Sequence, residues 1–176
     1  MKFLKVFSII LVVLVVLFIL IGIFLPKTAS LKRDITIQAS SRAVTDKIVA
    51  LYEDHFWPIW ERDDTTMVFY PLESGNGYRW EGNKVAQGEC EYTVDLDNTI
   101  RDNIRFQGRD VAGTTWRLEG SSPTELHVTF TVKAGGNLGT RWTNLFIEPL
   151  SGTAIDQILD GMKEELESDG LKKGTP

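Results

Sequence analysis

The fold of this chain is decided by residues 88–107, which read GECEYTVDLDNTIRDNIRFQ. Apolar and polar side chains alternate there, and an Asp-Asn turn interrupts the alternation near its middle. Because successive side chains of a β-strand point to opposite faces, the pattern predicts two antiparallel strands that each bury one face. The side chains expected on the buried face are Cys90, Tyr92, Val94 and Leu96 in the first strand and Ile100, Asp102, Ile104 and Phe106 in the second.

The same alternation recurs on both sides of these residues. It covers residues 31–38, 66–70, 78–81, 114–119 and 126–133, and Gly, Asn, Asp or Ser-Pro turns bound the runs. Between the second and third of these runs lies the turn-rich ESGNG segment, which is typical of a hairpin. We therefore expect about seven consecutive strands in one antiparallel sheet, and an α+β fold once the helices are added.

A first helix of the domain is predicted after the first strand. Ser40 and Ser41 suit a helix N-cap, and apolar residues then recur at helical intervals as far as Tyr52. A dense aromatic cluster follows at residues 56–60, where Pro58 prevents one regular helix from continuing. We expect a short second helix or a turn there.

The chain is predicted to close with an amphipathic helix. Apolar residues between Ile155 and Leu166 recur at helical spacing, and Gly170 is the expected stop. The predicted organisation is therefore a stub and membrane helix at 1–27, one domain at 28–170, and a disordered tail at 171–176.

Near the N-terminus, Val6 to Leu25 is an uncharged run of Val, Leu, Ile and Phe, interrupted only by Ser8 and Gly22. At about 1.5 Å per residue a helix of this length spans roughly 30 Å of hydrocarbon, so we predict a transmembrane anchor. A cleaved signal peptide is the alternative, although its apolar region is normally shorter. The flanking basic residues favour a cytoplasmic N-terminus and a domain outside the cytoplasm, in a bacterial inner membrane.

Composition excludes several other classes. The net charge of the 176-residue chain is −5, and two of its 19 basic residues precede the apolar run, so the domain lacks the basic surface of a nucleic-acid binder. Cys90 is the only cysteine, which rules out an internal disulfide. His55 and His127 lie far apart in contexts that indicate a helix end and a strand, so we predict no metal site and no cofactor.

The order of one strand, two short helices, six strands and a closing helix resembles the helix-grip fold. The chain looks like a membrane-anchored member of the START-related lipid-binding and polyketide-cyclase superfamily, often called SRPBCC. The stretches that carry this resemblance are LP at 25–26, RDITI at 33–37, ESGNGYRWEGN at 73–83, VAGTTW at 111–116, and RW at 141–142 leading to Met162. Ser40-Ser41 departs from the family, which commonly has a proline after the first strand.

The resemblance implies a curved sheet wrapped around the C-terminal helix, with a cavity between them for a hydrophobic small molecule or a lipid. Aromatic side chains of the inward set are large enough to line such a cavity. The cavity candidates are Tyr78, Trp80, Tyr92, Phe106, Trp116, Phe130 and Met162. A fully packed core without a cavity is the competing interpretation of the same residues.

Two further functions stay open at this stage. A cyclase- or hydrolase-like enzyme could use Asp102, whose strand position places a carboxylate among apolar neighbours, or Glu81. A structural module that binds a partner would need no ligand at all. The GNG at 75–77 lacks the third glycine of a phosphate loop and precedes a strand, which indicates a hairpin turn. The oligomeric state is not encoded in any pattern of the sequence.

Overall fold

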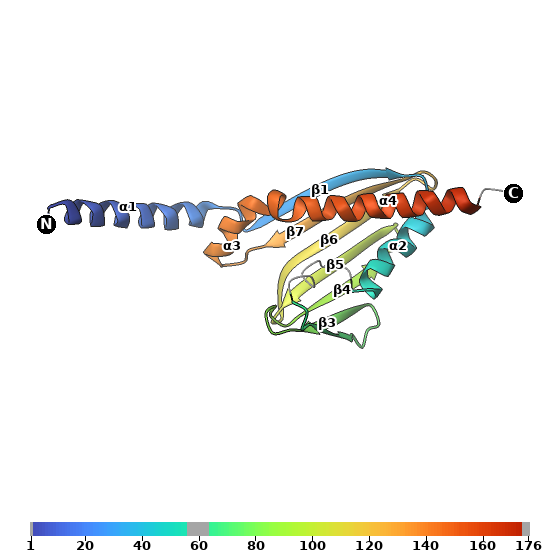
Figure 1. Ribbon diagram of the computed structural model, residues 1–176, viewed down its shortest axis with the longest axis horizontal. Coiled ribbons are helices and arrows are strands. Elements are labelled where there is room, and N and C mark those ends of the chain that lie inside the picture. Colours follow the sequence, from blue (N-terminus) through green and yellow to red (C-terminus); the bar gives the residue numbers. More distant parts are fainter. Residues whose placement is uncertain (1, 56–63, 174–176) are drawn as a thin grey trace.

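The computed structural model describes residues 2–55 and 64–173 (Figure 1). Its helical elements are α1 (Lys2–Phe24), α2 (Ser41–Glu53), α3 (Leu138–Thr143), the 3₁₀ turn η2 (Asn144–Phe146), the π turn η3 (Glu148–Gly152) and α4 (Thr153–Lys173). Its strands are β1 (Thr28–Ile37), β2 (Val68–Pro71), β3 (Gly77–Glu81), β4 (Gly88–Val94), β5 (Thr99–Phe106), β6 (Arg109–Glu119) and β7 (Thr124–Lys133). The short helix or turn predicted at 56–60 lies outside the described residues.

The seven described strands form one antiparallel sheet in the order β1-β7-β6-β5-β4-β3-β2, as the alternating pattern predicts. Neighbouring strands in this order are consecutive in the chain, except that the first strand, β1, pairs with the last, β7. In that pair Leu31 lies opposite Phe130. A register shift between Ile104 and Arg105 interrupts the pairing of β5 with β6. Such bulges bend a strand, which helps the sheet curve around the helices.

The core lies between the inner face of this sheet and the two helices α2 and α4. Helix α2 begins at the predicted N-cap, where the Ser40 hydroxyl accepts a hydrogen bond from the Ala43 amide. The buried side chains of α2 and α4 join the inward residues of β1 and β3–β7 in one apolar cluster. Arg33 connects β1 to the C-terminal helical segment. Its Nε donates to Asp156 Oδ1 of α4 at 2.5 Å, and its Nη2 forms an ion pair with Glu148 of η3.

Two details differ from the sequence predictions. Val94 and Leu96 are exposed, because β4 ends at Val94 and the chain then turns, with a 2.8 Å bond from the Asp95 amide to the Thr99 carbonyl. Helix α4 continues through Gly170 to Lys173, so residues 171–173 belong to the helix instead of a disordered tail. Glycine costs a helix only about 1 kcal/mol relative to alanine, which is too little to end it without a capping geometry.

Helix α1 projects away from the domain (Figure 1), and nearly all of its residues are apolar. Within the described residues, Lys5–Phe24 is a helix long and apolar enough to cross a membrane. Even Ile19, the most covered of its exposed apolar side chains, is 44% accessible. The helix is therefore not a core helix of the domain, and its surface suits hydrocarbon.

Candidate ligand-binding site

Two hollows lie near the C-terminal half of α2. The first, which we name the helix groove, separates α2 from α4 and has a volume of about 310 Å³. An ion pair between Lys47 Nζ and Glu165 Oε2, 2.5 Å long, joins two of its lining residues. The residues that line the helix groove are Lys47, Leu51, Asp54, Gln157, Ile158, Gly161, Met162 and Glu165.

The second hollow, the aromatic groove, lies where the end of α2 meets β2, β3 and β4, and its volume is about 320 Å³. Its rings contact one another closely: the Tyr52 and Tyr92 rings stack with centroids 4.7 Å apart, and His55 stacks on Phe69 at the same distance. The residues that line it are Tyr52, Glu53, His55, Phe69, Pro71, Gly75, Gly77, Tyr78 and Tyr92.

Local backbone geometry shapes the aromatic groove. His55 follows α2 with a φ of 57°. This left-handed backbone conformation brings its ring into an edge-on contact with the Tyr78 ring, with centroids 4.7 Å apart. Gly77 has a φ of 149°, and a Cβ built there would lie 2.1 Å from the Cys90 carbonyl oxygen. Only glycine fits this close approach of the hairpin to β4, as expected from the turn-rich sequence.

A buried polar network lies under the groove. The Tyr52 hydroxyl donates to Asp102 Oδ2 at 2.5 Å and accepts from Trp116 Nε1 at 2.8 Å. The backbone amide of Thr114 donates to the other carboxylate oxygen, Oδ1, at 2.8 Å. Asp102 is 8% exposed, so the sequence prediction of an inward carboxylate is confirmed. The network ties α2 to β5 and β6 through side chains far apart in the sequence.

Burial beside Asp102 keeps the Tyr52 hydroxyl and the Cys90 thiol protonated. Burial, followed by the charge of Asp102, raises the pKa of the Tyr52 hydroxyl well above 10.0. The same two causes raise the pKa of the Cys90 thiol above its usual 9.0, so this buried cysteine stays a neutral thiol at physiological pH. Tyr52 lines the aromatic groove and contacts Asp102, so it is the link between the groove and the buried carboxylate.

Comparison of the sequence with protein-family models and with curated protein sequences finds no match. Solved structures do resemble the chain. A START superfamily protein from Mycobacterium smegmatis has a TM-score of 0.50 and 11% identity, covering 79% of this chain and 97% of that one. The di-domain ARO/CYC protein BexL of the BE-7585A biosynthetic pathway has a TM-score of 0.53 and 14% identity, covering 80% of this chain and 50% of that one.

The chain has the helix-grip fold of the START-related (SRPBCC) superfamily. Norcoclaurine synthase from Thalictrum flavum, solved in complex with dopamine and hydroxybenzaldehyde, shares the fold with a TM-score of 0.51 and 11% identity, covering 85% of this chain and 90% of that one. At these identities the likeness establishes the fold alone.

Within the helix-grip frame, the predicted cavity residues separate into groups. Tyr78 and Tyr92 line the aromatic groove, and Met162 lines the helix groove. Trp80, Trp116 and Phe130 are buried in the core cluster, and Phe106 is a half-buried neighbour of Trp80, with centroids 5.4 Å apart. The sequence reasoning missed three ring residues of the aromatic groove: Tyr52, His55 and Phe69.

Glu81, the other acid considered for an enzyme, lies on the outer face of the helix-grip sheet. Its side chain is 50% exposed and lies 3.8 Å from Arg79 Nε, and its Oε1 accepts a 3.2 Å bond from Gln87. Trp80 points inward, so its neighbour in the strand must point outward. Glu81 therefore lies on the face of the sheet opposite Asp102 and the aromatic groove.

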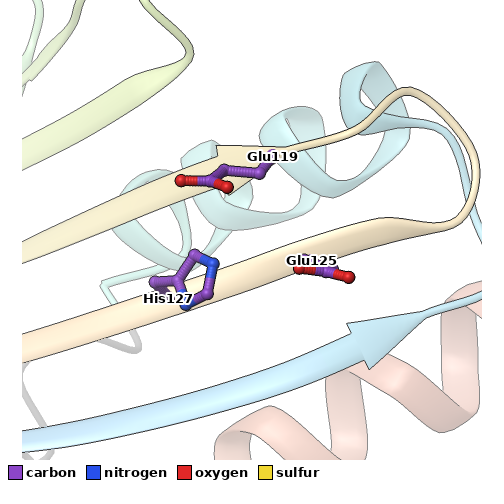
Figure 2. Close-up of side chains that lie close together, drawn as sticks. All are labelled: Glu119, Glu125 and His127. Atoms are coloured by element: carbon purple, nitrogen blue, oxygen red, sulfur yellow. The ribbon is translucent and has the colours of Figure 1, made fainter.

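A group of possible metal ligands also lies on the outer surface of the helix-grip sheet. Figure 2 shows Glu119, Glu125 and His127 on adjacent strands, and their ligand atoms lie within 4.8 Å of one another. Other partners already engage two of them: Arg117 Nε lies 3.1 Å from Glu119, and His127 Nδ1 lies 2.6 Å from Asp34. These contacts describe a polar cluster on the sheet face opposite the core.

Proposed function

We propose that the chain is a membrane-tethered binding domain for a hydrophobic small molecule or a lipid. The aromatic groove is the observation that carries this proposal: it is a hollow of about 320 Å³, walled largely by aromatic rings. Ligand pockets are typically at least this large and combine apolar walls with a few polar groups. Glu53 and His55 are the lining residues whose side chains end in a carboxylate and an imidazole.

The chemistry of the wall favours a ligand that contains a flat ring. Stacked and edge-on ring contacts contribute about 0.5–1.5 kcal/mol each beyond the burial of apolar area, so a planar ligand would extend the Tyr52–Tyr92 stack. Norcoclaurine synthase, with its two small aromatic ligands, supports this ligand class. The raised pKa of Tyr52 keeps the phenol neutral, so the ring that stacks on Tyr92 carries no charge.

The anchor would give the domain access to apolar ligands that partition into the bilayer. A single span places the domain at the membrane surface, where such ligands are most concentrated. We propose a bacterial inner membrane with the domain on its extracytoplasmic side, and protease digestion of spheroplasts, whose outer membrane has been opened, is the test. Digestion of the domain without lysis supports this orientation, and complete protection contradicts it.

Ligand binding is tested on the full chain in detergent. Native mass spectrometry should detect a co-purified apolar molecule, and an anilinonaphthalene sulfonate dye should bind the chain after that molecule is removed. His55→Asn removes the ring but tolerates the left-handed backbone, so dye affinity should fall about tenfold, or ~1.4 kcal/mol. His127→Asn, on the outer sheet face, is the matched control. Equal affinities of the two variants would refute the proposal.

One observation favours a second function, a cyclase- or hydrolase-like enzyme. The buried Asp102 carboxylate accepts a hydrogen bond from Tyr52, a lining residue of the aromatic groove, so one side chain separates the groove from an acid held among apolar neighbours. In this case Asp102→Asn should abolish conversion of the bound molecule, followed by mass spectrometry, while the circular dichroism spectrum stays unchanged. Unchanged conversion in a folded variant would exclude Asp102 as a catalytic residue.

A further inference from the structure

Helix α3 packs against the C-terminal end of α1. Trp142 of α3 stacks on Phe18 of α1, with ring centroids 4.4 Å apart and planes 4° from parallel. Gly22 makes room for this contact, since a Cβ there would lie 2.8 Å from the indole nitrogen of Trp142. The span and α3 therefore form one packed unit, although more than 100 residues separate them in the sequence.

Arg141 completes this unit with polar contacts. Its side chain is 8% exposed, and its Nη1 donates to the Ile23 carbonyl at 2.8 Å and to the Gly22 carbonyl at 3.5 Å. The last carbonyls of a helix have no partner within the helix, and a nearby cation also offsets the negative end of the helix dipole. A side chain of α3 thus satisfies two of the last carbonyls of α1.

The position of Phe18 sets the depth of α3. Phe18 precedes the last residue of α1, Phe24, by six positions, so it lies about 9 Å along the helix axis from that end. If α1 spans a bilayer, a ring stacked flat on Phe18 lies at a similar depth. Trp142 is then below the headgroups, within the roughly 5–10 Å that interfacial amphipathic helices reach.

The rest of this helical segment presents an apolar face to the outside. Leu145, Phe146 and Leu150 are 50%, 54% and 68% exposed, whereas Asn144 is buried and Ile147 packs against the core. Leu145, Phe146, Pro149 and Leu150 form an exposed face at helical spacing, and none of them carries a charge. A water-facing helix surface would be polar at these positions.

We propose that residues 138–150 lie in the headgroup–acyl boundary of the leaflet from which α1 emerges, with the outward apolar face inserted into hydrocarbon. The inference rests on the proposed membrane tether, and it adds a second, monotopic contact that fixes how the domain stands on the bilayer. The apolar face is continuous with the span through the Phe18–Trp142 stack, so one hydrocarbon phase covers both. Helix α4 then leads away from the surface, opposite to α1 (Figure 1).

This orientation places the helix groove close to the bilayer. Ile158 and Met162, which line that groove, lie eight and twelve residues beyond Leu150, or roughly 12–18 Å along the helical path. Because both α1 and the apolar face of residues 138–150 contact lipid, the helix groove stays at a constant height above the bilayer.

The test uses the full chain reconstituted in vesicles of phosphatidylcholine and phosphatidylglycerol. A polarity-sensitive nitrobenzoxadiazole dye is attached to single cysteines introduced by Phe146→Cys, Val13→Cys and Asp160→Cys, and native Cys90 is buried, so the unsubstituted chain measures background labelling. Quenching is measured with phosphatidylcholine that carries a nitroxide near the top of the acyl chain. Val13 reports on the span, and Asp160, exposed on α4, is the aqueous control.

We expect the dye at position 146 to be quenched several-fold more strongly than at 160 and to emit at shorter wavelength, with position 13 also in lipid. Quenching at 13 but equal weak quenching at 146 and 160 would overturn the inference and leave the tether intact. Weak quenching at 13 would remove the tether and the inference together. Leu150→Cys repeats the measurement on the same face, and circular dichroism confirms that each labelled variant is folded.

Discussion

Tyr52→Phe tests the buried network most directly, because it removes one oxygen and keeps the ring. The lost hydroxyl donates to the Asp102 carboxylate at 2.5 Å and accepts from Trp116 Nε1 at 2.8 Å. A hydrogen bond to a charged acceptor contributes about 1.5–3 kcal/mol, and depriving a buried donor of this acceptor costs about 1–3 kcal/mol. The two losses overlap, so we expect the free energy of unfolding to fall by about 3 kcal/mol.

The measurement is thermal and chemical unfolding of the full chain in detergent at pH 7, followed by circular dichroism. For a domain of this size, about 3 kcal/mol corresponds to a midpoint lowered by roughly 6–12 °C. Tyr70→Phe is the matched control, because Tyr70 lies on β2 with 40% of its surface exposed and takes no part in the network. Its unfolding should match that of the unsubstituted chain.

Alkaline pH gives the same variant a second readout. The pKa of Tyr52 is raised in the folded chain, so its proton stabilises the fold fully below pH 10. That stability is lost as the pH rises above 10, by up to about 1.4 kcal/mol per pH unit, since the unfolded phenol ionises first. Phenylalanine cannot ionise, and Cys90 is present in both chains, so the stability gap between them should narrow above pH 10.

Two results would refute this reasoning. One is a loss of less than about 1 kcal/mol at pH 7, which would mean that the network contributes little beyond neutral hydrogen bonds. The other is a gap that stays constant between pH 9 and 11, which would mean that the Tyr52 pKa is not raised. Dye binding in the groove should survive the substitution wherever the fold is intact, because the ring that stacks on Tyr92 remains.

Three further predictions concern other contacts. Gly77→Ala should lower the free energy of unfolding by about 3 kcal/mol or more, because the added Cβ would collide with the backbone of β4 and the φ there is positive. Gly136→Ala is the control, because a Cβ there meets no atom, and its thermal unfolding should match that of the unsubstituted chain. Asp64→Ala should make the stability of the fold less sensitive to acid, because the Thr66 hydroxyl and three backbone amides hold the Asp64 pKa below 3.8 in the folded chain. The stabilisation by Asp64 is therefore present above that pH and is lost on acidification, which denaturant titrations between pH 5 and 2 measure. A variant that loses stability as steeply as the unsubstituted chain would contradict this. Arg141→Met should uncap α1, so hydrogen exchange at its last amides in nanodiscs should accelerate, and unchanged exchange would show that the Ile23 carbonyl needs no cap.

Local patterns predicted most of the sheet, because the face that a strand residue occupies follows from its position alone. The inward placement of Asp102 and the outward placement of Glu81 both depend on this period of two. The pattern does not reveal whether another element covers a given part of the inward face. Val94 and Leu96 have the right parity but lie beyond the covered part of the sheet, so they are exposed.

The aromatic groove shows the same limit for the site. Tyr78 and Tyr92 were predicted by parity, but His55 reaches the groove through a left-handed backbone turn that no periodicity encodes. Phe69 reaches it through the pairing of β2 with β3, where it lies opposite Trp80. The division of one inward aromatic set into groove walls and solid core depends on how α2 and α4 pack on the sheet.

The sequence by itself determined the apolar span, the seven strands with their buried faces, and the amphipathic closing helix, because each depends on a repeat within about twenty consecutive residues. Only the tertiary structure decided which carbonyls Arg141 caps, which hydroxyl Asp102 accepts from, and how Trp142 docks on Phe18. Those contacts join residues 50 to 124 positions apart in the sequence. Their partners are chosen by the packing of whole elements, which a local repeat does not specify.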